Sequence, residues 1–422
     1  MNLLIDFLTA NGRYGAGEYH RRVVMSLIER IELDSRMDVK LFALFDSHVP
    51  ISFDDMRADC LGMKYGITYL DLHEKSLLEI INEYSIDRFF IACGQRIGMY
   101  PEIADVKCDV VCVTHDLLYE EWYSNHMYQY WNSLKESDED AVKEYNFLQR
   151  LRLLYGRVKN DIRCQLKILR NGIVSQRQGK QELDYMNAVV QMVKNNHSCT
   201  NIMVSEYSKR TMMYNFGIPS ERILVLYSPE RINCKLEPIK NESLRNLIDT
   251  GKKYYLMVSA DRECKNPIKS AKAFAHYSEL DKDAYFVMVG NKRTPLSDRQ
   301  INMDFLSDSD LAHAMMNCYA LVYPSFFEGF GYPPLEAMRY GKPVLCSNVT
   351  SIPEILGVAP VYFSPFYESS IFDAFMCLNE NNYDEYSKKS LCQYEVVAKR
   401  QENDLNHLVE ILLRPLNTEV IL

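Results

Sequence analysis

The chain has 422 residues, of which 47% are hydrophobic and 25% charged, and its formal net charge is −9. This length provides for two domains with full hydrophobic cores, and the composition is that of an ordinary soluble globular protein. The negative charge argues against nucleic acid as the main partner, and no apolar run is long enough to span a bilayer.

The twelve cysteines are scattered singly, without Cys-x-x-Cys pairs. No segment of the signal-peptide type, charged and then apolar, opens the chain. Free thiols in a reducing compartment, and therefore a cytoplasmic protein, are expected.

Strand-like and helix-like segments alternate along the chain. The expected helices include Gly17–Arg30 and Ile268–Tyr277, and the expected strands are Asn2–Thr9, Val39–Phe45, Arg88–Ala92, Val110–Thr114, Asn201–Val204, Tyr254–Ser259, Ala284–Val289, Cys318–Tyr323 and Pro343–Cys346. Alternating βα units imply parallel sheets with helices on both faces, so the two runs predict two Rossmann-like α/β domains.

The boundary between the two runs is expected near residue 230, because Ser228–Lys253 is rich in Pro, Asn, Glu and Lys. This divides the chain into an N-terminal domain of residues 1–230 and a C-terminal domain of residues 231–395. The last segment, 396–422, is expected to cross back to the N-terminal domain as a helix that Arg414-Pro415 ends.

A glycine-rich loop with Gly15 and Gly17 follows the first expected strand. His20 stands where a dinucleotide fingerprint needs its third glycine, so a nicotinamide or flavin enzyme is not favoured. For either glycine alone, a tight βα turn explains the pattern as well as a ligand site does. His115 follows another strand, at the edge where open α/β sheets bind ligands.

Residues of about 120–195 break the alternation, with a long polar helical pattern and no convincing strand. Between residues 150 and 180 there are nine Lys or Arg and one Asp. Arg150, Arg152 and Arg157 alternate with bulky apolar residues, which suits either a helix on an anionic membrane surface or a solvated helix beside a groove.

In the C-terminal domain, Arg262 and Lys265 lie in the loop after a strand, and Gly290 ends the next strand. Phe305 and Leu306 precede a helix. We interpret Asp308-Ser-Asp310 as the first turn of that helix, with Ser307 as N-cap and Asp310 completing a capping box, and not as a metal site.

The stretch Glu328-Gly-Phe-Gly-Tyr-Pro-Pro-Leu-Glu336 follows the strand that ends at Pro324. Gly329 and Gly331 allow a sharp turn and a close approach of the backbone to a ligand. Pro333 and Pro334 are expected to start a helix, and the free backbone N–H groups at the start of a helix form a site for phosphate. Carboxylates beside phosphate repel it, so Glu328 and Glu336 are expected to bind hydroxyl groups.

This arrangement resembles the E-x7-E motif of the retaining family 4 glycosyltransferases, and the likeness continues through Ala337-Met-Arg-Tyr-Gly-Lys-Pro-Val-Leu-Cys-Ser347 to Ile352-Pro-Glu-Ile-Leu-Gly357. The resemblance implies the GT-B fold, in which two Rossmann-like domains face a cleft. It also implies a nucleotide-sugar donor in the C-terminal domain, an acceptor in the N-terminal domain, and catalysis without a metal or other cofactor.

The resemblance implies a role for each motif residue. His115 donates a hydrogen bond to the transferred sugar, which Glu328 also orients, and Glu336 holds the ribose. Arg262 and Lys265, with the loop of Gly329, Phe330 and Gly331, are implied to bind the donor diphosphate. Gly290, Phe305 and Leu306 are further donor-binding positions, with the base held near the turn of Phe305 and Leu306. Gly15 and Gly17 are implied to bind the donor on the phosphate and acceptor side.

The implied acceptor is a saccharide or a lipid-linked saccharide, as in the synthesis of O-antigen, capsule or exopolysaccharide in bacteria. Peripheral contact with the inner face of an anionic membrane is a further expectation. Two alternatives remain open, namely a glycosyltransferase-like scaffold without catalysis and another GT-B enzyme such as a sugar-nucleotide epimerase.

Overall fold

The computed structural model describes residues 1–8, 15–34, 38–48, 66–94, 100, 102–117, 189–196, 198–231 and 234–415. Most of the predicted insertion of residues 120–195, including Arg150, Arg152 and Arg157, lies outside these ranges. None of the helices within the described ranges is long and apolar enough to cross a membrane.

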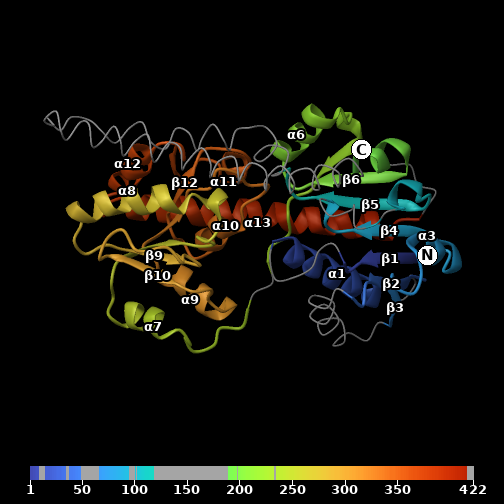
Figure 1. The fold of residues 1–422 in the computed structure, drawn as a ribbon, viewed down its shortest axis with the longest axis horizontal. Coiled ribbons are helices and arrows are strands. Elements are labelled where there is room, and N and C mark those ends of the chain that lie inside the picture. The colour runs from blue at the N-terminus through green and yellow to red at the C-terminus, as the bar shows by residue number, and fades with distance from the viewer. Residues whose placement is uncertain are drawn as a thin grey trace, which may run out of the picture.

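Two parallel sheets form the two halves of the molecule (Figure 1). The N-terminal sheet has the order β3-β2-β1-β4-β5-β6-β7. Its strands are β1 (Asn2–Asp6), β2 (Lys40–Phe45), β3 (Ile67–Asp71), β4 (Arg88–Ile91), β5 (Asp109–Thr114), β6 (Cys199–Met203) and β7 (Ile223–Val225).

The C-terminal sheet has the order β10-β9-β8-β11-β12-β13. Its strands are β8 (Tyr254–Met257), β9 (Tyr285–Val289), β10 (Gln300–Met303), β11 (Ala320–Tyr323), β12 (Val344–Ser347) and β13 (Val361–Phe363). In each sheet the direction of strand succession reverses once, between β1 and β4 and between β8 and β11. Such switch points are where open α/β sheets bind ligands.

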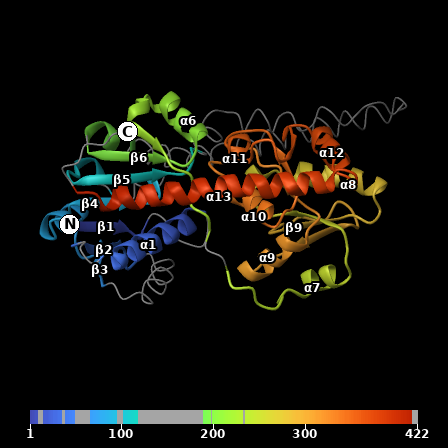
Figure 2. The ribbon, with the colours of Figure 1, turned by 180° about the vertical axis from the view of Figure 1, so that it is seen from behind.

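Helices cover both faces of the two sheets (Figures 1 and 2). They are α1 (Gly15–Leu33), α3 (Leu77–Glu83), α6 (Glu206–Phe216), α7 (Glu242–Asp249), α8 (Pro267–Leu280), α9 (Asp308–Asn317), α10 (Tyr332–Arg339), α11 (Ile352–Leu356), α12 (Glu368–Cys377) and α13 (Tyr383–Leu413). The central strands, such as β4, β6, β8, β11 and β12, are continuous buried runs, as sheets covered on both faces require.

The predicted strands and the two Rossmann-like sheets are confirmed, with ends that differ by up to three residues. The pattern missed four short strands at or near sheet edges, β3, β7, β10 and β13. It also took all of Ser228–Lys253 as linker, whereas α7 lies inside this segment, capped by the Asn241 side chain, which accepts the N–H of Leu244 at 2.9 Å.

Helix α13 crosses from the C-terminal half to the N-terminal half (Figure 2). It packs against α10 and then against α1. Its buried side chains recur at helical spacing, at Val397, Gln401, Leu405, Leu408 and Leu412. One stripe of this helix therefore completes the core of both halves.

Arg88, only 1% exposed, holds the end of α13 on the N-terminal sheet. Its Nη1 donates to the carbonyl oxygens of Ile411 and Leu412, each at 2.8 Å, and of Arg414 at 3.0 Å. Its Nε donates to Oδ2 of Asp109 at 2.6 Å. The buried guanidinium thus pairs with carbonyl groups at the end of α13 that have no partner within the helix, and its charge stabilises the negative end of the helix dipole.

The segment that links the halves meets α13 where both cross between them. The N–H of Tyr227 donates to Oδ2 of Asp404 at 2.7 Å, and Nε2 of Gln401 donates to the carbonyl oxygen of Ser228 at 2.6 Å. The guanidinium of Arg400 lies 3.5 Å from the centre of the Tyr227 ring. The linker and α13, the two stretches of chain that cross between the halves, are therefore hydrogen-bonded to each other.

Candidate functional site

Lys265 and Glu328 meet at the switch point of the C-terminal sheet. Lys265 ends a 3₁₀ turn after β8, and Glu328 follows β11, so adjacent parallel strands deliver both to one edge. The Lys265 ammonium donates to Oε1 of Glu328 and, at 3.2 Å, to the hydroxyl of Tyr323. The pairing of β8 with β11 thus makes neighbours of residues 63 positions apart.

This ion pair is buried, with 9% of the Lys265 side chain and 12% of the Glu328 side chain exposed. Burial acts to raise the pKa of Glu328, but the charge and hydrogen bond of Lys265 outweigh it, and the pKa lies below the ordinary value. Glu328 is therefore a carboxylate at neutral pH, available to accept hydrogen bonds from hydroxyl groups.

The loop that carries Glu328 is fixed by the loop after β12. The N–H of Glu328 donates to Oγ1 of Thr350 at 3.2 Å, and Oγ of Ser351 donates to the Glu328 carbonyl oxygen at 2.9 Å. Phe330 is buried, with its ring against Tyr227 at 5.4 Å. The backbone of Phe330 can therefore bind a sugar donor, whereas its side chain belongs to the core.

The loop of Gly329 touches the N-terminal domain. A Cβ atom on Gly329 would lie 2.0 Å from the carbonyl oxygen of His115 and 2.8 Å from Cβ of Asp116. The hydroxyl of Ser205, the N-cap of α6, donates to the Gly329 carbonyl oxygen at 2.8 Å. Glycine is needed here for close approach, and the two halves stand in a closed arrangement.

His115 lies at the end of β5, as predicted, and the ring of Tyr19 meets it edge-on at 4.8 Å. Its Nε2 is 2.8 Å from the carbonyl oxygen of Ala92. Burial lowers the pKa of His115, only partly offset by Ala92 and Asp116, so the ring is neutral at neutral pH. Because a carbonyl oxygen only accepts, Nε2 must hold the proton.

The contact of His115 with the transferred sugar stays a prediction, and in this structure the ring could make it only as a hydrogen-bond acceptor. The one N–H of the neutral ring is engaged by Ala92, which leaves Nδ1 as an acceptor. A sugar hydroxyl could donate to Nδ1, whereas the ring has no second proton to give.

Arg262 lies at the start of the same turn as Lys265, with its side chain reaching solvent. Burial acts to lower its pKa, but Cys264, Glu328 and Asp116 raise it above the ordinary value. Arg262 and Lys265 thus place two cations beside Glu328, facing the end of β5. This is a suitable setting for a diphosphate.

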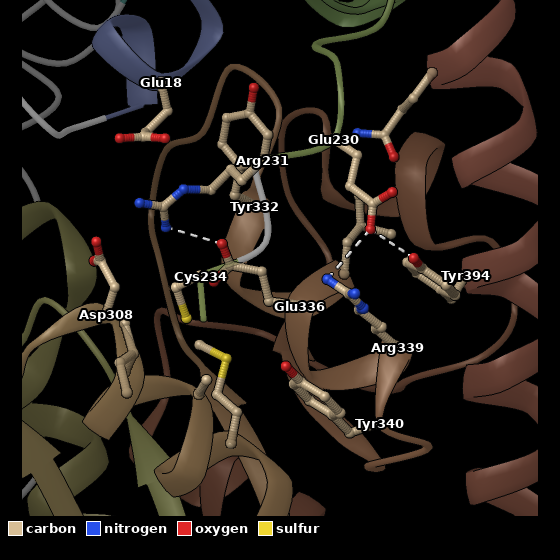
Figure 3. A pocket seen from close by; sticks show the side chains of 15 residues that line it. Glu18, Glu230, Arg231, Cys234, Asp308, Tyr332, Glu336, Arg339, Tyr340 and Tyr394 are labelled. Atoms are coloured by element: carbon tan, nitrogen blue, oxygen red, sulfur yellow. Dashed lines mark hydrogen bonds and ion pairs between the residues drawn. The ribbon is translucent and has the colours of Figure 1, made fainter. Parts of the chain in front are cut away.

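Glu336 faces a neighbouring pocket (Figure 3). There the Nη1 of Arg231 donates to its Oε1 at 2.8 Å, with about a quarter of each side chain exposed. Glu18, in the first turn of α1, points into the same space from the N-terminal domain. No sequence pattern pointed to Arg231, which is one basic residue in a polar linker.

Gly290 and Phe305 come together at the ends of β9 and β10. Gly290 has φ +85°, and a Cβ atom there would lie 3.3 Å from the Phe305 ring, which is 58% exposed. Leu306 follows, half-buried against the core. Gly15, the first residue of α1, is exposed, and Gly17 is buried in its first turn, so this helix begins two residues earlier than predicted.

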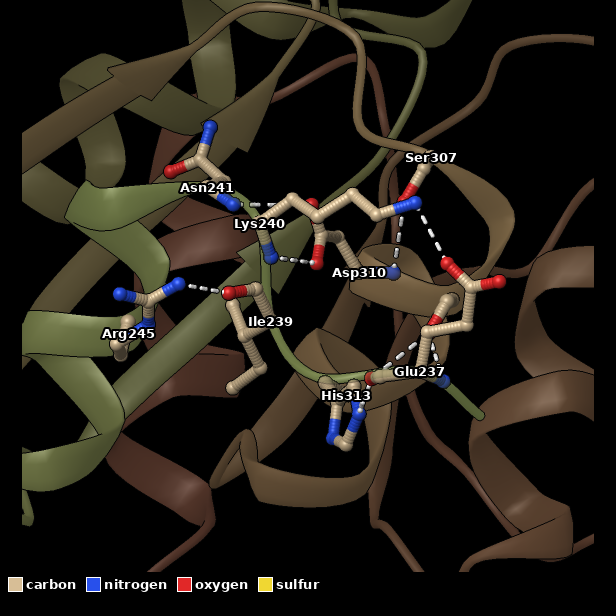
Figure 4. Close-up of polar contacts among 9 residues, drawn as sticks. Glu237, Ile239, Lys240, Asn241, Arg245, Ser307, Asp310 and His313 are labelled. Atoms are coloured by element: carbon tan, nitrogen blue, oxygen red, sulfur yellow. Dashed lines mark hydrogen bonds and ion pairs between the residues drawn. The ribbon is translucent and has the colours of Figure 1, made fainter. Parts of the chain in front are cut away.

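Ser307 caps α9 as predicted, accepting the N–H of Asp310 at 3.1 Å. The carboxylate of Asp310 does not close a capping box. It accepts the N–H groups of Lys240 at 2.9 Å and Asn241 at 3.1 Å, and so fixes the segment before α7 on α9 (Figure 4). Within the described ranges no cluster of three His, Cys, Asp or Glu side chains is suited to a metal ion.

Comparison with known proteins supplies the context for this geometry. Residues 239–359 match the family model described as Glycosyl transferases group 1. Serotype-specific mannosyltransferase WbdA of Escherichia coli is 31% identical over 290 residues, which are 66% of this chain and 30% of that protein. O-antigen chain mannosyltransferase RfbU of Salmonella typhimurium is 28% identical over 186 residues, 41% of this chain and 49% of that protein. The matched regions therefore span less than half of each relative.

Solved structures match almost the whole chain. Alr3699/HepE of Anabaena, in complex with UDP and glucose, has a TM-score of 0.62 at 14% identity and covers 98% of this chain and 99% of its own. A glycosyltransferase from Rickettsia africae ESF-5 has a TM-score of 0.59 at 14% identity, with 99% of both chains covered. WaaG, a glycosyltransferase involved in lipopolysaccharide biosynthesis, has a TM-score of 0.58 at 14% identity, covering 98% of this chain and 100% of its own. The predicted GT-B fold is thereby confirmed.

Proposed function

We propose that this protein is a retaining glycosyltransferase that moves a sugar from a nucleotide-sugar donor to a saccharide acceptor. The observation that carries the proposal is the buried pair of Lys265 and Glu328, which stands at a switch point directly across from the end of β5. The C-terminal half of the site thus offers cations and a carboxylate. The N-terminal half offers the neutral ring of His115, which can accept a hydrogen bond.

The donor diphosphate is assigned to Lys265, Arg262 and the backbone around Gly329 and Gly331. Without donor, the Lys265 ammonium is balanced by Glu328. An arriving diphosphate gives the ammonium a second anionic partner, which loosens its hold on Glu328 and lets that carboxylate accept hydrogen bonds from the sugar. The same cations stabilise the charge that the leaving nucleoside diphosphate gains as the glycosidic bond breaks.

The acceptor approaches from the N-terminal domain. Its hydroxyl attacks from the face of the leaving group, and a phosphate oxygen of the donor takes its proton, so the anomeric configuration is kept. No metal ion is required in this proposal, because Arg262 and Lys265 provide positive charge where a metal would otherwise be needed. The Nδ1 atom of His115 accepts a hydrogen bond from a hydroxyl group of the transferred sugar, and the ring stays neutral.

The curated relatives suggest the biological setting. WbdA and RfbU are described as mannosyltransferases, RfbU of the O-antigen chain. We therefore propose mannose as the transferred sugar and a growing surface polysaccharide, free or lipid-linked, as the acceptor. The reaction would take place on the cytoplasmic side of the membrane, where nucleotide sugars are made.

Two measurements test this function. A thermal-shift screen against UDP-, GDP-, dTDP- and ADP-sugars, with and without a chelator, is expected to give a selective shift that the chelator does not change. A ligand at a hundredfold excess over its Kd stabilises the fold by about 2.7 kcal/mol. Incubation with the selected donor and a mannose-terminated oligosaccharide should then give a product one sugar longer, with the donor's anomeric configuration by NMR. A product of opposite configuration would exclude retention, and no shift with any donor would favour a non-catalytic scaffold.

Contact with an anionic membrane is also proposed, on the basis of the sequence alone. Neutralising Arg150, Arg152 and Arg157 together should reduce co-sedimentation with phosphatidylglycerol vesicles, and added salt should do the same. Equal sedimentation of the variant and the parent protein would refute this part of the proposal.

A further inference from the structure

Helix α6 belongs to the N-terminal half and lies where the two halves meet (Figures 1 and 2). Its N-cap, Ser205, accepts the N–H of Ser208 at 3.1 Å. The N–H groups of Glu206 and Tyr207 donate to Glu354, at 2.8 Å to Oε1 and at 2.9 Å to Oε2. Because Glu354 lies in α11 of the C-terminal half, two of the first N–H groups of α6 have their partner across the interface.

Both oxygens of the Glu354 carboxylate thus hold the positive end of α6. A hydrogen bond from a backbone N–H to a carboxylate is about twice as strong as one between neutral groups, and a negative charge also suits the helix dipole. The hydroxyl of Tyr227, in the linker, donates to Oε1 of the same carboxylate at 3.1 Å. Among the residues that the structure describes, these are the hydrogen-bond partners of Glu354, and none of them is assigned to the diphosphate or the sugar.

The segment that carries Glu354 also holds the loop of Glu328. Thr350 accepts the N–H of Glu328, and Ser351 donates to its carbonyl oxygen. Ser351 directly precedes α11, in which Glu354 is the third residue. Thr350 has φ +55°, a left-handed conformation that is unusual for a β-branched residue. This short segment is therefore bound to the Glu328 loop at one end and to α6 at the other.

The start of α6 lies at the same edge of the N-terminal sheet as His115. Strands β5 and β6 are parallel neighbours, with Thr114 opposite Met203. His115 and the residues that lead into α6 therefore leave the sheet side by side. A contact that holds α6 also holds the end of β5 against the loop of Gly329, which approaches the His115 backbone closely.

We propose that Glu354 is a positioning residue for sugar transfer, which keeps the two halves closed by capping α6 across the interface. The inference rests on the proposed function and adds the group that sets the N-terminal domain against the Glu328 loop. Glu354 acts through α6 and contacts no reacting group. Loss of its carboxylate leaves the diphosphate site intact but lets the halves separate, so that His115 and the acceptor no longer meet the sugar at reaction distance.

Glu354→Gln tests the proposal, because glutamine keeps the size of the side chain but has one acceptor oxygen, no charge, and an amide group that faces an N–H of α6. We expect kcat for transfer to fall about tenfold or more, the effect of losing a hydrogen bond to a charged group. The calorimetric Kd for UDP or GDP, whichever binds more tightly to the wild-type protein, should stay unchanged. Small-angle X-ray scattering of the ligand-free variant should give a larger radius of gyration.

The matched control is Glu242→Gln, which changes an exposed carboxylate in the first turn of α7 and should equal the wild type in all three measurements. A double variant separates positioning from simple damage. A Cβ atom on Gly329 already forces the halves apart, so Glu354→Gln should cost little further rate in the Gly329→Ala background.

Four results would overturn the inference: a wild-type kcat, an unchanged radius of gyration, full additivity in the double variant, or a loss of nucleoside diphosphate affinity as large as the loss of kcat. No transfer by the wild-type protein would overturn the proposed function and the positioning role with it. The scattering comparison needs no activity, and it would still show whether Glu354 holds the halves closed.

Discussion

Replacing Gly329 by alanine should separate donor binding from sugar transfer. The added Cβ would lie 2.0 Å from the backbone carbonyl oxygen of His115, and ordinary contact begins at 3.4 Å, so the two halves must move apart by about 1.4 Å. A misplacement of about 1 Å can cost a hundredfold in rate. We therefore expect kcat/KM for transfer to fall by about two orders of magnitude.

The affinity for nucleoside diphosphate should change little, because the groups assigned to the diphosphate belong to the C-terminal half and do not cross the interface. The displaced loop also loses the hydrogen bond from Ser205 to the Gly329 carbonyl, worth about 1 kcal/mol of unfolding free energy. Steady-state transfer kinetics and calorimetry on the same sample measure both effects. Gly66→Ala is the matched control, since a Cβ atom on Gly66 meets nothing within 4 Å. Wild-type kcat/KM for Gly329→Ala would refute the reasoning that the closed arrangement is the catalytic one.

Three further predictions concern buried charges. Lys265→Ala should weaken binding of a nucleoside diphosphate about tenfold in calorimetry, because a charge-assisted contact is lost; unchanged affinity would remove Lys265 from the diphosphate site. The lowered pKa of His115 means that the unfolded chain takes up its proton more readily, so the free energy of unfolding should decrease as the pH falls below 6.5, and His115→Gln should show less of this loss. Equal pH profiles for the two proteins would contradict that expectation. Arg88→Met leaves the Asp109 carboxylate and the last carbonyls of α13 without their cation and should cost about 3–5 kcal/mol in denaturant unfolding. Adding Asp109→Asn should recover part of it, and a cost below about 1 kcal/mol would show that the contact is not needed.

The central elements of both sheets could be predicted because their strands are continuous apolar runs bounded by turn residues. The rule that parallel strands bring their carboxyl ends to one edge was then enough to place Lys265, Glu328 and Gly290 on the same side of one sheet. Strands near the edges were missed because three to five residues with partly exposed side chains leave little periodicity, as at β3 and β13.

Hydrogen bonds and ion pairs between residues distant in the sequence could not be predicted from local sequence patterns. The ion pair of Arg231 with Glu336 joins residues 105 positions apart through the path of a linker. The carboxylate of Asp310 looked like a local cap, yet it bonds a segment about 70 residues earlier. The role of His115 depended on the ring orientation that the Ala92 carbonyl selects, and no local sequence signal reports such a choice.

The fastening of the linker to α13 limits how the molecule can move. Because the two connections cross side by side and are joined through Asp404 and Gln401, we expect them to act as a hinge about which the halves swing apart more easily than they slide past each other. Helix α13 has 31 residues and so is about 46 Å long, and its end is anchored by Arg88. Such a swing would bend or twist α13, because the helix packs on both halves and its end is held by Arg88. We therefore expect the stiffness of α13, which borders the pocket beside Glu336 through Tyr394 and Gln401, to affect how readily the halves separate.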